Sequence, residues 1–433
     1  MSLETQESVR HLQQELAGKS KLEPEYRFYS LYDKVYRMDV LWEAWLKVKA
    51  NKGSAGIDGM TVAEIEAAGA GEYIKSIHEE LKAKSYRPQP LRRVWIPKAN
   101  GKQRPLGIPT VKDRIVQQAV RMIIEPIFEV NFSDCSFGFR PGRGCQQAAK
   151  EVVKYLNWGL TNVVEADIVN CFGSIPQQRL IKAVALRIAD GAILKLIRQW
   201  LKSGVMENGQ YHETTMGTPQ GGVISPLLAN IYLDALDQVW KRRKMADREG
   251  SNAHLVRYAD DLVVLTDGDP KNPMQLLERI FGKLDLELHP EKTRILNARM
   301  ADFDFLGFNF RQRKNPKTGK WFCLMQPSRK AQNNLREKIR EATTPGVKAE
   351  LGVVVKERMN PILRGWVNYF RIGNSSKVFW KIQHFAEARL RRFMRRRQGR
   401  YGYGWKDITS ELLYGKLGLF YDYGVIRYRP ARA

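Results

Sequence analysis

Residues 254–266 contain the pattern that most restricts how this chain can fold. Two apolar arms, 255–256 and 262–265, flank the tetrapeptide YADD at 258–261. Apolar runs around a short polar break predict a strand–turn–strand unit. The tip of this unit carries two adjacent carboxylates, Asp260 and Asp261. Because aspartate is common in solvated turns, the pair taken alone is typical of an ordinary turn.

A second acidic residue in a similar setting changes this interpretation. Asp167 lies in the largely apolar segment 162–168, which also contains Glu165 and which we expect to form a buried central strand. A carboxylate buried there without a partner is strongly unfavourable. A divalent metal shared with Asp260 and Asp261 would supply the partner, since carboxylate oxygens are the ligands that Mg²⁺ prefers. Two-metal sites take ligands from separate segments and assist phosphoryl transfer.

The charge of the chain indicates the kind of partner. The 433 residues carry 72 Lys and Arg against 46 Asp and Glu, a formal charge of +26. Such a balance favours binding to a polyanion, and nucleic acid is the first candidate. Residues 329–433 hold 24 Lys and Arg against 8 Asp and Glu, so the positive charge is concentrated near the C-terminus. A hydrophobic fraction of 43% excludes wholesale disorder.

Several other classes are excluded. The four cysteines form no C-x-x-C pair and the six histidines are scattered, which argues against a disulfide framework or a zinc module. No apolar run reaches the roughly 18 residues of a membrane span. The first 20 residues lack the apolar core of a signal peptide. We therefore expect a cytoplasmic protein without a membrane partner.

Periodicity predicts an α+β body followed by a basic helical domain from about residue 328. A short basic hairpin is expected at 91–96 and 103–108, with its turn at Asn100 and Gly101. Helical spacing of apolar residues predicts the remaining elements. The expected helices are 29–49, 113–128, 225–241, 328–343, 347–371 and 376–397.

Eight short motifs then appear in one order along the chain. They are GIDG (56–59), RPLGIP (104–109), SFGFRPGR (136–143), DI (167–168) with CF (171–172), GTPQGG (217–222), YADD (258–261), EKT (291–293) and FLGF (305–308). In this order they resemble the reverse transcriptases encoded by group II introns, of the bacterial type. The segment NPILRGWVNYF at 360–370 resembles the maturase, or thumb, domain of the same family.

The resemblance implies a right-handed polymerase in which fingers and a palm with an antiparallel sheet precede an all-helical thumb/maturase domain. The implied division is an N-terminal extension at 1–27, fingers and palm at 28–312, a connector at 313–327, the helical domain at 328–400 and a short basic, aromatic tail at 401–433. The tail is too short, and too poor in Cys and His, for the endonuclease domain that many relatives append. We therefore expect intron mobility to depend on a nick or a replication fork made by another agent.

The resemblance also implies roles for individual residues. Asp167, Asp260 and Asp261 match the catalytic, metal-binding carboxylates, which hold two Mg²⁺ ions, with Mn²⁺ as a substitute. Lys292 is a candidate proton donor to pyrophosphate, with an ordinary surface lysine as the alternative. The residues that match the dNTP-binding set are Lys98, Arg104, Phe172 and Gln220. For Phe172, the expected gate against a ribose 2′-hydroxyl, core packing is the alternative, and for Lys98 a solvated hairpin lysine is.

Arginines are expected to contact nucleic acid in two places, because their forked side chains bind phosphates bidentately. Arg140 and Arg143 lie in the glycine-rich loop 138–144, where an internal ion pair is the alternative. Residues 389–400 hold seven basic residues and no acidic one, a run that should bind phosphates in a salt-dependent way. The members of this run expected to do so are Arg391, Arg392, Arg395, Arg396 and Arg397. Gly173 departs from the family pattern, which often has another aspartate there.

The expected function is RNA-dependent DNA synthesis by two-metal nucleotidyl transfer, together with intron RNA binding, splicing assistance and a role in intron mobility. The expected partners are intron RNA, an RNA or DNA template with its primer, and dNTPs. One alternative is a related polymerase that serves host DNA repair, whose catalytic residues would be the same. Another is an RNA-binding splicing factor without polymerase activity, against which the complete carboxylate set argues.

Overall fold

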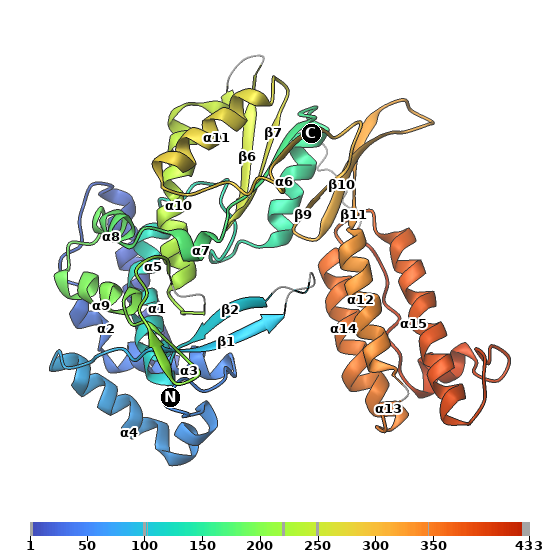
Figure 1. Ribbon diagram of the computed structural model, residues 1–433, viewed down its shortest axis with the longest axis horizontal. Helices are drawn as coiled ribbons and strands as arrows, with labels where there is room; N and C mark the ends of the chain where they lie inside the picture. Colours follow the sequence, from blue (N-terminus) through green and yellow to red (C-terminus); the bar gives the residue numbers. More distant parts are fainter. Residues whose placement is uncertain are drawn as a thin grey trace.

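The computed structural model describes residues 3–97, 101, 103–218, 221–247, 251–344 and 346–426. Figure 1 shows a mixed α/β body and, beside it, a lobe of C-terminal helices. The N-terminal part of the body is helical, and α1 and α3 pack against α5. Its helices are α1 (Leu3–Leu22), α2 (Tyr32–Val35), α3 (Met38–Ala50), α4 (Val62–Lys82) and α5 (Val111–Glu129).

These helices test two of the expectations. The helix predicted at 113–128 is confirmed as α5, which begins after Thr110, whose hydroxyl accepts from the backbone N–H of Asp113 (3.0 Å). The helix predicted at 29–49 is instead divided into α2 and α3. The chain is extended at Arg37, and the carboxylate of Asp39 accepts from Arg37 Nε (3.1 Å) and from the backbone N–H of Val40 (2.9 Å). Local polar contacts therefore begin a new helix where the apolar spacing alone predicts continuity.

The described residues form three sheets. In the first, the strand order is β2-β1-β4-β5, with only the β1–β4 pairing parallel among its described strands. Its members are β1 (Leu91–Pro97), β2 (Gln103–Ile108), β4 (Val205–Glu207) and β5 (Gln210–His212). The predicted basic hairpin is thus confirmed, although Asn100 of its predicted turn lies outside the described residues. Figure 1 shows β1 and β2 reaching toward the helical lobe.

The central sheet is antiparallel throughout its described strands, in the order β6-β7-β3-β8. It consists of β3 (Asn162–Asp167), β6 (Ala253–Tyr258), β7 (Asp261–Thr266) and β8 (Arg294–Asn297). The central strand predicted at 162–168 is therefore confirmed as β3, which ends one residue earlier, at Asp167. The helices around the sheet are α6 (Cys145–Asn157), α7 (Cys171–Ser174), α8 (Gln177–Ala185), α9 (Gly191–Leu201), α10 (Ser225–Arg242) and α11 (Lys271–Lys283).

A third sheet connects the body to the helical lobe. Its antiparallel order is β11-β10-β9, formed by β9 (Phe303–Phe305), β10 (Phe308–Lys314) and β11 (Trp321–Pro327). The lobe then follows with α12 (Arg329–Ala342), α13 (Leu351–Val353), a π-helical stretch (Val354–Met359), α14 (Asn360–Phe370) and α15 (Ser376–Arg397). Figure 1 shows α15 running away from the central sheet. In the described part of the chain, no helix is long and apolar enough to cross a bilayer.

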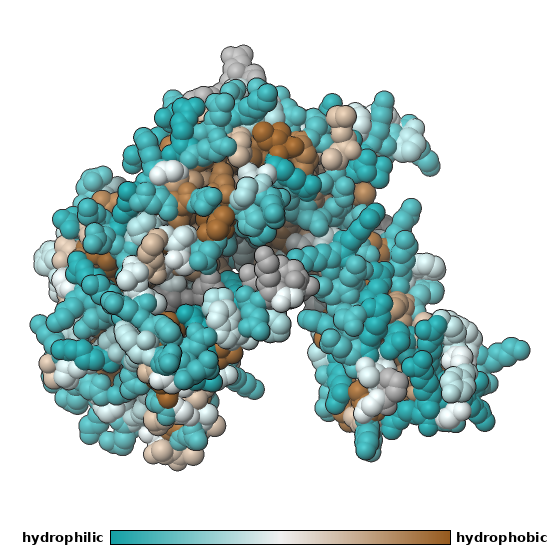
Figure 2. Space-filling view, in the orientation of Figure 1, coloured by the Kyte–Doolittle hydropathy of each residue, from teal (hydrophilic) through white to brown (hydrophobic). Residues whose placement is uncertain are grey.

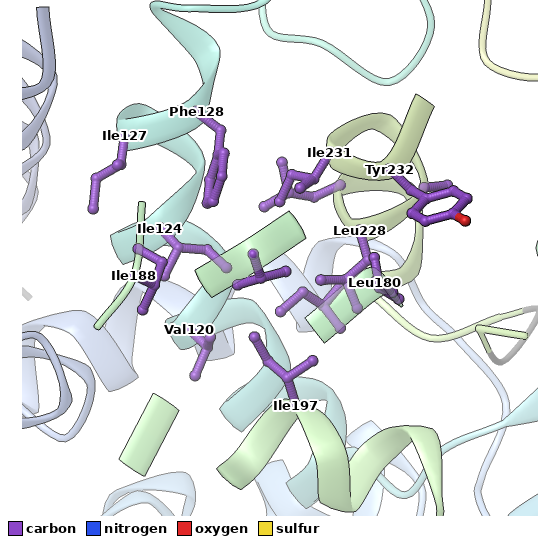
Figure 3. Packing of buried hydrophobic residues seen from close by; sticks show 14 of the residues in the cluster. Val120, Ile124, Ile127, Phe128, Leu180, Ile188, Ile197, Leu228, Ile231 and Tyr232 are labelled. Carbon is purple, nitrogen blue, oxygen red and sulfur yellow. The ribbon is translucent and has the colours of Figure 1, made fainter. Parts of the chain in front are cut away.

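The apolar side chains form two cores on opposite faces of the central sheet. Alternation along the strands directs Val164 and Leu262 into the first core and Val163 and Val263 into the second. The first core joins the N-terminal helices to α8, α9 and α10, as Figure 3 shows for side chains of α5, α8, α9 and α10. The second core joins α6, the third sheet and the helical lobe. It also includes Ile408, Leu413, Leu419 and Phe420, so part of segment 401–426 is packed into the lobe.

Candidate functional site

The three candidate carboxylates lie at one end of the central sheet. Asp167 is the last residue of β3 and Asp261 is the first of β7, and the strand register places them directly opposite each other. Asp260 precedes Asp261 in the tight turn between β6 and β7, where Ala259 takes a left-handed φ of 56°. The sheet therefore pairs Asp167 with Asp261, two carboxylates that are 94 residues apart in the sequence.

The electrostatics of this group favour a cation. Partial burial, followed by repulsion from Asp260 and Asp167, raises the pKa of Asp261 to about 6. The pKa of Asp260 is also raised, first by burial and then by Asp167, although the charges of Arg104 and Lys292 act in the opposite direction. The positive charge of Arg104 and Lys292 is thus too small to balance the three carboxylates. A bound divalent ion stabilises carboxylates in such an arrangement.

Lys292 is the nearest cation to Asp167. Its ammonium forms an ion pair with Asp167 Oδ2, while most of the lysine side chain remains exposed. The chain after α11 is held at this point by a hydrogen bond from the backbone N–H of His289 to the carbonyl of Asp167 (2.8 Å). This backbone contact places the segment that carries Lys292 next to Asp167.

The donor set fits hard divalent cations. All three side chains offer carboxylate oxygens, the ligands that Mg²⁺ and Mn²⁺ prefer. Among the described residues, no three His, Cys, Asp or Glu side chains are arranged so that they could hold a metal ion without some rearrangement. Asp167 is instead paired through Oδ2 with the Lys292 ammonium, so a divalent ion at that oxygen would compete with the amine.

Two of the four predicted nucleotide contacts can be located. Arg104 lies on β2 opposite Ile96, and its side chain is exposed at the hairpin. Its charge lowers the pKa of Asp260, so the guanidinium acts electrostatically on the carboxylates. Lys98 and Gln220 lie outside the described residues.

Phe172 is held in place by close backbone contacts. It follows Asn170, which has a left-handed φ of 45°, and its carbonyl accepts from the backbone N–H of Thr218 (2.6 Å). A Cβ atom at Gly217 would lie 2.6 Å from that same carbonyl oxygen, so only glycine fits there. The ring of Phe172 is half-buried against the first core, which leaves room for both packing and contact with a ligand.

Phe139 is a residue of the site that the sequence analysis does not identify. Its side chain is 46% exposed, and its φ of 57° is in the left-handed region that bulky residues rarely adopt. Its ring centroid lies 6.4 Å from that of Phe172 and 6.3 Å from that of Tyr258. The backbone approach is equally close, because a Cβ at Gly138 would lie 2.5 Å from the nitrogen of Ala259. The SFGFRPGR loop and the YADD turn are thus in direct contact.

A buried arginine supports both of these segments. Arg257, just before YADD, is fully buried and forms an ion pair with Asp237 of α10. Its Nη2 donates to Ser136 Oγ (2.8 Å), and its Nη1 donates to the carbonyl of Ala259 (3.2 Å). The arginine that follows Leu255 and Val256 in the strand 253–258 is the signal that could have identified it, since a buried cation requires a partner.

The structure corrects the expectation for Arg140. Its side chain is 3% exposed, and its Nη2 donates to Glu129 Oε1 (2.8 Å). Its Nη1 donates to the carbonyls of Ser133 (2.6 Å) and Ser136 (2.8 Å). The alternative of an internal ion pair is therefore the correct one, and Arg140 is not available to nucleic acid. Arg143 pairs with the exposed Asp134 and remains accessible from solvent.

The arginines at the end of α15 likewise include one that is buried and others that are exposed. Arg391 is buried, donates to the carbonyl of Ile408 (2.9 Å) and pairs with Glu387 (3.0 Å), so the expectation that it binds nucleic acid is wrong. Arg392 contacts Tyr403, and Arg395 pairs with Asp407 (2.8 Å), but both remain partly exposed. Arg396 and Arg397 are exposed.

Comparison with known proteins agrees with this arrangement. Residues 96–310 match the reverse transcriptase (RNA-dependent DNA polymerase) family, and residues 332–410 match the maturase-specific domain of group II introns. The chain is 35% identical over 351 residues to the group II intron-encoded protein LtrA of Lactococcus lactis subsp. cremoris, covering 66% of this chain and 57% of LtrA. It is 33% identical over 361 residues to protein YkfC of Escherichia coli, covering 75% and 94% respectively.

An uncharacterized 91 kDa protein in a cob intron of Schizosaccharomyces pombe is 30% identical over 354 residues, covering 68% of this chain and 43% of that protein. The chain thus spans somewhat more than half of LtrA and less than half of the yeast protein, while it covers nearly all of YkfC. A reverse transcriptase match followed by a maturase match, in that order, agrees with the motifs that surround the carboxylates. The chain therefore belongs to the family of group II intron-encoded reverse transcriptases with a maturase-specific domain.

Proposed function

We propose that this protein is an RNA-dependent DNA polymerase that extends a primer on an RNA or DNA template and also binds intron RNA to assist splicing. The observation that carries the proposal is the register of β3 and β7, in which Asp167 faces Asp261 with Asp260 beside it. Family membership and the excess of positive charge support the same assignment.

Asp167, Asp260 and Asp261 would hold the divalent ions, two Mg²⁺ or Mn²⁺ in their place. The chemistry that such ions would supply is stabilisation of an ionised primer 3′-hydroxyl and of the charge on a departing pyrophosphate. Arg104, together with Lys98 of the same hairpin, would bind the triphosphate. Lys292 would hold a proton on Nζ next to Asp167, in position to pass it to pyrophosphate.

The remaining residues would select and align the nucleotide. The ring of Phe172 would contact the sugar of the incoming nucleotide and exclude a 2′-hydroxyl, and Gln220 would contact the template or the base. Phe139 would extend the aromatic surface between Phe172 and the YADD turn. The buried ion pair of Arg257 with Asp237 would keep this turn in one position.

In this proposal the chain is a right hand. The β1–β2 hairpin belongs to the fingers, the central sheet is the palm, and the C-terminal helices from about residue 328 are the thumb and maturase domain. Figure 2 shows the surface hollowed between the body and the helical lobe, with mostly hydrophilic residues along its rim. A primer–template duplex would lie in this hollow. Arg143 is a candidate to contact nucleic-acid phosphates from the body, and Arg392, Arg395, Arg396 and Arg397 are candidates to contact the phosphates of intron RNA from the helical lobe. Intron mobility would follow from DNA synthesis on a nick made by another agent.

Primer extension tests the proposal. Purified protein is given an annealed primer on RNA and DNA templates in parallel, with dNTPs and Mg²⁺. We expect extension on the RNA template. Asp260→Asn should lower the extension rate by roughly 100-fold or more, because removal of a metal ligand should reduce activity at least as much as removal of a residue that only orients a ligand. Asp269→Asn, an exposed aspartate of the turn before α11, is the matched control and should extend normally.

A wild-type protein that binds intron RNA but extends no primer with Mg²⁺ or Mn²⁺ would instead support the RNA-binding splicing factor. Group II intron RNA on both sides of the gene would favour the intron-encoded polymerase over a polymerase that serves host DNA repair.

A further inference from the structure

Three aromatic side chains are exposed within five residues directly after α15. Tyr401 is 88% exposed, Trp405 53% and Tyr403 37%. The rings of Tyr403 and Trp405 lie nearly parallel, at an interplanar angle of 25° with centroids 6.0 Å apart. We call residues 401, 403 and 405 the aromatic surface. A monomer rarely leaves large apolar rings together in solvent unless they meet a partner.

The aromatic surface is held in place by arginines of α15. The guanidinium of Arg391 lies 4.3 Å from the centroid of Trp405, and that of Arg392 lies 4.0 Å from the centroid of Tyr403. Arg395 Nε donates to the carbonyl of Tyr401 (3.3 Å). Immediately after the surface, Ile408 is buried in the second core. The segment is therefore held at Tyr403 and Trp405 through their rings and at Tyr401 through its backbone carbonyl, which lowers the entropic cost of binding a ligand.

The charge around the rings favours a polyanion over a protein partner. The aromatic surface follows residues 389–400, which contain seven basic residues and no acidic one. Arg396 and Arg400 are exposed close to it, and the acidic Asp407 is already paired with Arg395. Cations interleaved with exposed aromatic rings are the combination that binds single-stranded nucleic acid, since each base offers a flat face and each nucleotide a phosphate.

From this combination we infer that the aromatic surface binds unpaired bases of RNA by stacking, at a site separate from the proposed polymerase cleft. A paired duplex would present phosphates but not base faces, so it would not need the rings. Figure 1 shows the end of α15 at the far end of the helical lobe from the central sheet. The inference rests on the proposed function for its partner, an RNA with unpaired loops, and it adds where and by what chemistry that RNA is bound.

The experiment compares two labelled RNA strands of equal length, one with bases and one with abasic sites and the same phosphates. Excess unlabelled primer–template duplex is present to fill the cleft, and binding is followed by fluorescence anisotropy. We expect the wild type to prefer the strand with bases. Tyr401→Ala and Trp405→Leu should each weaken binding of that strand by roughly 5- to 100-fold, as expected for one stacked base.

Their affinity for the abasic strand should stay unchanged, because the phosphate contacts remain. Tyr401→Phe should restore binding, since it keeps the ring. The matched control is Tyr421→Ala, which removes a tyrosine of the same lobe that is 77% exposed and lies outside the aromatic surface. This control should bind both strands as the wild type does.

Two results would overturn the inference: equal affinity of the wild type for both strands, or variants that lose affinity for both strands alike. Primer extension by the same proteins keeps this test separate from that of the proposed function. We expect Tyr401→Ala to extend a primer normally. If the wild type extends a primer but the ring variants bind the strand with bases as tightly as the wild type does, only the inference on the aromatic surface fails. If the wild type extends no primer, only the proposed polymerase activity fails.

Discussion

The guanidinium of Arg257 and the carboxylate of Asp237 form an ion pair that is completely shielded from solvent. The pair connects α10 to the strand that ends in YADD, and Arg257 also holds Ser136 and the carbonyl of Ala259. One buried arginine thus fixes the turn that carries Asp260 against the loop that carries Phe139.

Because each partner alone would be a buried, uncompensated charge, Arg257→Met or Asp237→Leu should lower the free energy of unfolding by about 3–5 kcal/mol. The double variant should recover most of this loss, since two apolar side chains replace the pair. Urea unfolding followed by circular dichroism measures all three. Single variants as stable as the wild type would show that the pair contributes little to the fold.

The ion pair of Lys292 with Asp167 predicts competition between the lysine and the metal. Lys292→Met should reach half-maximal extension at a lower Mg²⁺ concentration, by up to about fivefold, because an exposed ion pair is worth up to about 1 kcal/mol. Its maximal rate should fall by roughly 100-fold if the amine donates a proton to pyrophosphate. A magnesium titration of primer extension separates the two effects, with the exposed Lys271→Met as control. An unchanged magnesium midpoint would argue against competition for Asp167.

Phe172 should set the preference for deoxyribonucleotides. Phe172→Ala removes the ring from the sugar site, so discrimination against ribonucleotides should fall by about 10- to 100-fold. The measurement is the ratio of kcat/KM for a dNTP and for the matching rNTP. Phe322→Ala, which removes an exposed ring of β11, serves as the control. An unchanged ratio would return Phe172 to a packing function alone.

Gly217 should tolerate no side chain. Its φ is 80°, and a Cβ would meet the carbonyl oxygen of Phe172 at 2.6 Å. Gly217→Ala should therefore lower stability by about 1–3 kcal/mol and disturb sugar selection through Phe172. Gly282→Ala, in α11 with no atom within 4 Å of the added Cβ, should instead gain up to about 1 kcal/mol. Thermal unfolding compares them, and equal melting temperatures would contradict the close approach.

Two arginines of α15 should behave differently despite their similar sequence setting. Arg396 is exposed, so Arg396→Gln should reduce the slope of log K against log salt for RNA binding by about 1 and leave stability unchanged. Arg391 is buried with Glu387, so Arg391→Gln should cost about 3 kcal/mol of stability. Salt titrations of RNA binding and urea unfolding test both expectations. A lower salt slope for Arg391→Gln at full stability would contradict its internal position.

Much of the site was predictable because its signals are local. The apolar strands around Asp167 and the YADD turn, the basic hairpin of β1 and β2 and the helix α15 all follow from periodicity and turn residues within short windows. The order of the motifs was enough to indicate the family. The break between α2 and α3 was not predictable, because a polar contact of Asp39 outweighs apolar spacing there.

The sequence by itself determined which residue types are present, the order of the strands and helices, and the excess of positive charge. The tertiary structure alone decided which charges meet solvent. Arg140 and Arg391 look like phosphate-binding arginines, yet each meets a glutamate, Glu129 or Glu387, in a buried position. Likewise, no local pattern in the sequence predicts that the rings of Phe139 and Tyr401 are exposed. Exposure depends on what the rest of the chain packs against a side chain, and those contacts join residues far apart in the sequence.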